Sequence, residues 1–155
     1  MSEEITTPEQ VFVIQKVYTK DISFESPNTP EIFREDDWHP NINLQLQSRS
    51  KPLDENVFEI VLMVTVTAKT DDETTAYLAE VQQAGIFRIS GFEDEEMRYM
   101  VGSYCSNILF PFAREVVSDL VTRGGFPQLL LSPVNFDALF SQQQEQESAD
   151  GETLQ

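Results

Sequence analysis

Alternating apolar and polar positions along the chain predict β-strands. The strongest pattern lies in 57–69, where every second residue is apolar and forms one continuous face: Phe58, Ile60, Leu62, Val64 and Val66. Successive side chains of a strand point to opposite faces, so the second face carries the intervening residues: Glu59, Val61, Met63, Thr65 and Thr67. A short charged cluster separates this strand from a second long strand over 74–90. The short connection predicts an antiparallel hairpin.

Within the strand 74–90, the alternation assigns neighbouring residues to opposite faces. One face holds Leu78, Glu80 and Gln82. The other face holds Ala79, Val81 and Gln83. The chain therefore presents two surfaces of different character along one strand.

Two further strands are predicted before this hairpin. Residues 11–20 form a strand with apolar side chains on both faces. Residues 38–47 alternate cleanly between a polar face and an apolar face that includes Trp38, Ile42, Leu44 and Leu46. The segments 21–37 and 48–56 are predicted as loops, and the first contains two prolines that disfavour helix and central strand.

Helices are predicted in the last third of the chain. A short helix over 93–101 is weakened by Gly102, and Asn107 can cap a longer helix over 108–123. Apolar residues cover about half of the circumference of the longer helix, whereas packing on one core needs an arc of roughly 100°. We therefore expect the longer helix to have a second partner.

A last helix begins at Ser132-Pro133 or at Asn135 and runs to about Phe140. Strands followed by helices predict an α+β fold, a four-stranded antiparallel sheet with two C-terminal helices packed on one face. We expect one folded domain over 11–140, with disordered ends at 1–10 and in the polar, acidic segment 141–155.

The charge of the chain narrows the class of partner. The net charge is −17 and the isoelectric point is about 4.1. Such a surface repels nucleic acid and anionic membranes, and it attracts basic partners. No apolar run is long enough to span a bilayer, and the first residues lack the pattern of a signal peptide. The single cysteine fits a reducing, cytoplasmic setting.

Residues suited to catalysis or metal binding are scarce. His39 and Cys105 are each the only residue of their kind, and they lie in unrelated contexts. We interpret them as a solvated strand-edge histidine and a buried structural cysteine. The chain has no clustered zinc ligands and no glycine-rich phosphate loop after a strand. The sequence therefore predicts a protein that is not an enzyme and needs no cofactor or metal.

Apolar residues in unexpected places indicate a binding function instead. The proline-containing loop carries Phe24 and Phe33, and the strand after it carries the apolar face that begins at Trp38. Apolar patches rimmed by charge mark binding surfaces, but core packing produces the same pattern. For 24–46 both interpretations stay open on the pattern alone.

Several segments together resemble the SecB family of bacterial export chaperones. They are YTKDISFESPN (18–28), EVQQAGIFRISG (80–91), NILFPFAREVVSDLV (107–121) and GFPQLLLSPVNFDALF (125–140). The resemblance runs from about Phe12 to Phe140. The chain departs from the family pattern at Ser106, where proline is common, and at Ala79, where cysteine is common. At Asp36-Asp37, just before Trp38, the chain is slightly longer than the family pattern.

The resemblance implies an ATP-independent holdase that binds unfolded precursor proteins and delivers them to SecA. It also implies a homotetramer, built as a dimer of dimers. It assigns the client groove to six apolar residues: Phe24, Phe33, Trp38, Ile42, Leu44 and Leu46. It assigns SecA docking to Asp21, Glu25, Leu78 and Glu80. It assigns the subunit interface to Ala79, Val81 and Gln83.

Two other functions compete with this interpretation. A SecB-like chaperone for a toxin–antitoxin pair would keep the groove without needing the SecA-docking residues. An acidic mimic of nucleic acid would titrate a basic protein and would have no affinity for unfolded polypeptide. The presence of Asp21, Glu25, Leu78 and Glu80 favours the export chaperone.

Overall fold

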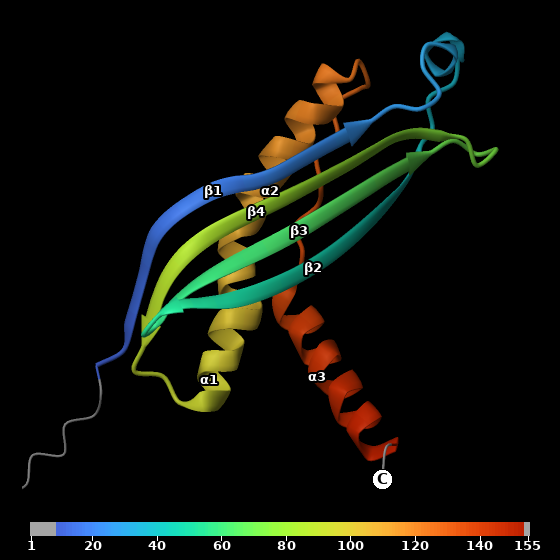
Figure 1. The fold of residues 1–155 in the computed structure, drawn as a ribbon. Coiled ribbons are helices and arrows are strands. Elements are labelled where there is room, and N and C mark those ends of the chain that lie inside the picture. Colours follow the sequence, from blue (N-terminus) through green and yellow to red (C-terminus); the bar gives the residue numbers. More distant parts are fainter. Residues whose placement is uncertain (1–8, 154–155) are drawn as a thin grey trace, which may run out of the picture.

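Four antiparallel strands form one sheet that carries the helices on a single face (Figure 1). The computed structural model describes residues 9–153. Strand order is β1-β4-β3-β2, with β1 at Val11–Glu25, β4 at Thr75–Ser90, β3 at Val57–Lys69 and β2 at Asn41–Asp54. The predicted α+β architecture is confirmed. Residues 1–8, most of the N-terminal segment 1–10 that was expected to be disordered, lie outside the described residues.

The central strands agree with the alternation in the sequence. β3 has the predicted bounds, and β4 begins one residue later than predicted. In β3 the side chains of Ile60, Leu62, Val64 and Val66 are all buried against the helices. The opposite face of the sheet carries no helix in the described chain, and we call it the open face (Figure 1).

Both edge strands are longer than predicted. β1 continues to Glu25 because two register shifts, at Gln15 and Lys20, let it follow β4 along its length. Each bulge inserts a residue that breaks the alternation of the sequence. β2 begins after Trp38, at Asn41, and includes the predicted loop 48–56 up to Asp54. Pairing with β3 accounts for this extension, and Pro52 is tolerated because β2 is an edge strand.

Between β1 and β2 the chain makes a short 3₁₀ helix, η1 (Glu31–Arg34). Ile32 in this helix is buried, and its backbone N–H donates to the carbonyl of Asn28. The connection that was predicted as a loop is therefore folded down onto the core.

The helical part is more continuous than predicted. Helix α1 (Asp94–Tyr99), the π-helical segment η2 (Met100–Tyr104) and helix α2 (Cys105–Arg123) follow each other without a break. The expected interruption at Gly102 and the cap at Asn107 are wrong, because Asn107 lies inside α2. The ring of Phe140 packs against Gly102, where a Cβ atom would lie 2.6 Å from Cε2 of that ring.

Helix α3 (Phe136–Thr153) begins where the sequence allowed. Of the two predicted starts, Asn135 is confirmed, since its Oδ1 accepts a hydrogen bond from the backbone N–H of Ala138 at 3.0 Å. The helix runs on through Thr153 in place of the disordered tail predicted from Ser141. Gln and Glu dominate this stretch, and their high helix propensity explains the extension.

Candidate functional site

A cluster of aromatic rings lies at the end of α2. The ring of Phe126 is buried, and its centroid lies 4.9 Å from that of Phe33, 5.5 Å from that of Trp38 and 4.9 Å from that of Tyr77. Phe24 stacks on Tyr77 at 5.9 Å. Three predicted groove residues, Phe24, Phe33 and Trp38, therefore meet in one place. We call these five residues the aromatic cluster.

The two glycines after α2 make the aromatic cluster possible. The rings of Phe24 and Phe33 pack directly against Gly124 and Gly125. A Cβ atom at Gly124 would lie 2.4 Å from Cζ of Phe24 and collide with it, whereas one at Gly125 would make a tight contact of 3.2 Å with Cζ of Phe33. Gly125 also has a positive φ of +90°, which other residues rarely adopt. Sequence reasoning missed Phe126 and Tyr77 as members of the cluster. The position of Phe126 immediately after Gly124-Gly125 is the signal that could have found it.

The other predicted groove residues lie along the edge strand β2. Ile42, Leu44 and Leu46 are opposite Ala68, Val66 and Val64, so they point to the helix-covered face. Leu44 and Leu46 are half-buried on the same core as Trp38. Phe33 in the aromatic cluster and Ile42 on β2 keep 49% and 38% of their surface exposed. The predicted groove residues thus include both packed and accessible apolar side chains.

Four predicted docking residues share the open face. Asp21 is opposite Gln82, and Glu25 is opposite Leu78 in the β1–β4 pairing. Glu80 lies between these rows, opposite Ser23. Opposite residues of antiparallel strands project to the same side, so Asp21, Glu25, Leu78 and Glu80 form one surface. Asp21 and Glu25 belong to β1 and not to the predicted loop, which fixes their spacing.

The three predicted interface residues lie inside the chain. Ala79, Val81 and Gln83 are buried on the face of β4 that α2 covers. The Oγ1 of Thr19 donates a hydrogen bond to Oε1 of Gln83 at 3.0 Å, which satisfies the amide oxygen. The prediction that these residues share a face is confirmed. Within the single chain all three are buried, and Gln83 lines a hollow beside α2, so their assignment to the subunit interface stays a prediction.

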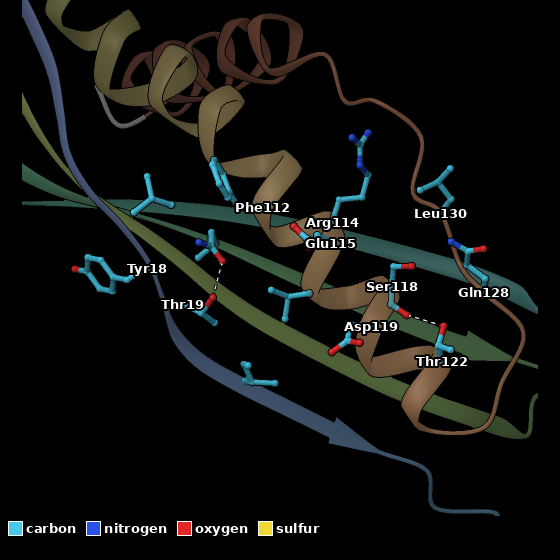
Figure 2. Close-up of a pocket in the computed structure, with 14 residues that line it drawn as sticks. Tyr18, Thr19, Phe112, Arg114, Glu115, Ser118, Asp119, Thr122, Gln128 and Leu130 are labelled. Atoms are coloured by element: carbon cyan, nitrogen blue, oxygen red, sulfur yellow. Dashed lines mark hydrogen bonds between the residues drawn. The ribbon is translucent and has the colours of Figure 1, made fainter.

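A hollow of about 960 Å³ runs between β1 and the outer side of α2 (Figure 2). Ile22, Phe112 and Leu130 line it with 50%, 46% and 71% of their surface exposed. Figure 2 shows Phe112, Arg114, Glu115 and Asp119 along α2 and Leu130 on the segment that follows the helix. From α2 the hollow takes Phe112 and Val116 beside polar and charged side chains, and the second partner predicted for this helix stays a prediction. The hollow itself was not predicted, because it depends on how β1 lies beside α2.

The residues considered for catalysis lie in settings that suit a structural role. Cys105 is buried, and burial raises the pKa of its thiol to about 12, so it is a poor nucleophile at neutral pH. His39 is exposed on the loop before β2, with Nε2 3.1 Å from Oδ1 of Asp37. Within 9–153 there is no group of three potential metal-ligating side chains. The helices described there are all too short or too polar to cross a membrane.

Comparison with known proteins gives consistent results. A family model described as preprotein translocase subunit SecB matches residues 6–147. The protein-export protein SecB of Nitrosococcus oceani is 60% identical over 141 residues, covering 90% of this chain and 85% of that protein. The protein of the same name from Methylococcus capsulatus is 57% identical over 143 residues, covering 92% of this chain and 91% of that protein.

A solved structure shares the fold at low sequence identity. It is a SecB-like chaperone of Mycobacterium tuberculosis in complex with a ChAD peptide from an antitoxin. The TM-score is 0.66 at 16% identity, covering 80% of this chain and 91% of that chain. At this identity the likeness shows the architecture alone.

Proposed function

The chain belongs to the SecB family of protein-export chaperones, and from this membership we propose that it holds unfolded precursor proteins and delivers them to SecA in the cytoplasm. The proposed action is a binding equilibrium that needs no nucleotide, metal or covalent chemistry. A holdase that binds the unfolded form shifts the client away from folding by mass action.

Client binding is assigned to the aromatic cluster and the adjoining β2 edge. The exposed surfaces of Phe33 and Ile42 offer apolar contact to a client. Phe33 is held in place by the buried ring of Phe126, so the site does not need to reorganise on binding. About 300 Å² of apolar contact at ~25 cal/mol per Å² contributes about 7 kcal/mol before ordering costs. The unpaired edge of β2 adds main-chain hydrogen-bonding groups for an extended client.

SecA docking is assigned to the acidic surface of the open face. The coplanar arrangement of Asp21, Glu25, Leu78 and Glu80 is the observation that carries this part of the proposal. Three carboxylates around one half-buried leucine suit a basic partner segment with an apolar contact at its centre. Because this surface and the aromatic cluster lie on opposite faces of the sheet, client and SecA can bind together.

Assembly into a homotetramer, a dimer of dimers, is assigned to the hollow between β1 and α2. Its exposed apolar side chains come from β1 (Ile22), from α2 (Phe112) and from the segment after α2 (Leu130). Ala79, Val81 and Gln83 support this surface from below, because they set the position at which α2 packs. Substitutions of Ala79 and Val81 act on assembly through α2, whereas Gln83 also lines the hollow itself.

One experiment separates these assignments. The full chain should delay refolding of a slow-folding precursor, measured by recovery of the precursor's fluorescence, and the double variant Phe33→Ser/Ile42→Ser should shorten that delay. The variant Glu80→Lys should keep the delay and lose SecA binding in calorimetry. Native mass measurement of each variant controls for assembly.

The outcomes discriminate between functions. A chain that causes no delay is not a holdase, and the proposal fails. A chain that delays refolding but does not bind SecA favours a SecB-like chaperone for another client, such as a toxin–antitoxin pair. Equal SecA affinity of Glu80→Lys and the wild type contradicts the docking assignment alone.

A further inference from the structure

Half of the cationic side chains gather on one half of the open face. The chain has 10 lysines and arginines against 27 acidic residues. Five of the ten are exposed residues of β1, β2 and β4: Lys16, Lys20, Arg49, Lys51 and Arg88. We call this group the cationic half.

The strand register places these residues on a common surface. Lys51 is opposite Glu59, which is opposite Ile86, which in turn is opposite Lys16. This row crosses the whole sheet, and its members project to one side. Phe58, the neighbour of Glu59, packs on the core below the sheet, so the row lies on the open face. Arg88 follows at the next position on this face of β4, opposite Val57.

Internal carboxylates neutralise little of this charge. Glu59 accepts hydrogen bonds from the hydroxyl of Tyr18 and from Nζ of Lys20, which lies 2.9 Å from its Oε1. Only 12% of the Glu59 side chain is exposed, and its carboxylate is already paired with Lys20. Asp54, at the end of the same face, accepts a hydrogen bond from the backbone N–H of Glu55. Within the described residues, Lys16, Lys51 and Arg88 form no ion pair.

The other half of the open face has the opposite charge. Its rows begin at Asp21, Ser23 and Glu25 on β1 and cross β4 and β3 to uncharged residues of β2. These rows include Glu80 and contain no lysine or arginine. The open face is therefore bipolar, with an acidic surface beside a cationic half on one rigid sheet.

A bipolar surface selects the orientation of a partner. A partner with cations over the acidic surface and carboxylates over the cationic half gains both sets of contacts in one orientation. Rotated by a half turn, it would meet like charges at both ends, which costs binding energy. Nucleic acid fits this surface poorly, because the rest of a chain with a net charge of −17 repels a uniform polyanion.

We propose that the cationic half is a second docking patch, which binds an acidic polypeptide segment of the same partner that engages the acidic surface. The two patches together fix the orientation in which the partner lies on the sheet. This inference rests on the proposed SecA docking at Asp21, Glu25, Leu78 and Glu80.

Charge reversal at the unpaired cations tests the inference. The triple variant Lys16→Glu/Lys51→Glu/Arg88→Glu of the full chain should bind SecA about tenfold more weakly or worse at low salt. The difference from the wild type should shrink as salt is raised. The matched control Arg34→Glu/Arg98→Glu/Arg123→Glu changes the net charge equally, at exposed positions outside the sheet. It should retain most of the affinity, since its charges lie away from the patch.

The outcomes distinguish this inference from the function on which it rests. Unchanged affinity of the triple variant, with binding lost in Glu80→Lys, overturns the second patch and keeps the docking surface. Binding unchanged in both variants overturns both. An equal loss in the matched control shows that net charge alone governs binding, which also overturns the patch.

A probe of defined chemistry completes the test. A glutamate-rich peptide labelled with a fluorophore should bind the wild type, and the triple variant should lose that binding. A single-stranded oligonucleotide of equal charge should bind neither. Equal binding of the oligonucleotide and the peptide to the wild type would show general attraction of polyanions and would contradict a polypeptide ligand.

Discussion

The two faces of the sheet follow different physical rules although they share the same strands. In β3 the side chains under the helices, such as Leu62 and Val64, are buried and fill a fixed volume. Their neighbours Met63 and Thr65 lie on the open face among polar and charged side chains. One face is therefore constrained by packing and the other by charge. Substitutions on the open face can alter binding while the fold persists.

The largest expected effect is a cavity on the helix-covered face. Phe87 is fully buried beside Leu109, and Phe87→Ala should lower the free energy of unfolding by about 3–5 kcal/mol. Urea denaturation at fixed protein concentration measures the change. Thr67→Ala on the open face is the control and should stay within about 0.5 kcal/mol. Similar losses in the two variants would remove the distinction between the faces.

An intermediate effect is expected at Glu59, a hydrogen-bonded carboxylate that lies among the residues of the cationic half. The pKa of Glu59 is lowered because the hydroxyl of Tyr18 and the ammonium of Lys20 donate hydrogen bonds to it. Glu59→Gln should therefore cost about 1–2 kcal/mol at pH 7. A carboxyl group whose pKa is lower in the folded state stabilises the fold above its unfolded pKa and loses this contribution as the pH falls.

The difference between wild type and Glu59→Gln should thus be full at pH 7 and shrink as the pH falls below the usual glutamate value of 4.5. Urea denaturation across this range provides the measurement. Glu80→Gln, on the same face, serves as the control with little effect on stability. A constant difference down to pH 3 would contradict the role of the ionised carboxylate.

The smallest effect is expected at an exposed cross-strand contact. Nη2 of Arg49 donates a hydrogen bond to Oε1 of Gln82 at 3.1 Å across the open face. A double-mutant cycle with Arg49→Ala and Gln82→Ala should give a coupling of about 0.5 kcal/mol or less. A coupling above about 1.5 kcal/mol would mean that the open face contributes to the fold more than its exposure indicates.

The fold was predictable where local pattern and pairing agree. β3 has its predicted bounds because strict alternation continues through Val57–Lys69. The predicted first strand ended at Lys20, although β1 continues to Glu25. The bulges at Gln15 and Lys20 interrupt the alternation, and only the pairing with β4 reveals them. The helical break expected at Gly102 does not occur, since the Phe140 ring packs against that glycine from far along the chain.

Alternation predicted which site residues share a face of the sheet, but not which face the helices cover. Alternation separated Glu80 from Val81 correctly, yet it could not tell which side α2 would cover. Ala79, Val81 and Gln83, assigned to the subunit interface by the family resemblance, are buried within the single chain, and alternation alone could not predict this. Phe126 was missed as the centre of the aromatic cluster because its partners come from two distant segments, the β1–β2 connection and β4, and no local spacing in the sequence indicates that they meet.

The packing of Phe140 on Gly102 gives α3 the mechanics of a lever. Phe136 and Phe140 hold the first turns of the helix, and every described side chain after them, 141–147, is exposed. At 1.5 Å per residue, Phe136–Thr153 is about 27 Å long. The part beyond Phe140 is about 20 Å long, so a tilt of about 10° about the contact with Gly102 would carry the far end about 3.5 Å. The absence of a side chain at Gly102 therefore sets the position of the whole helix.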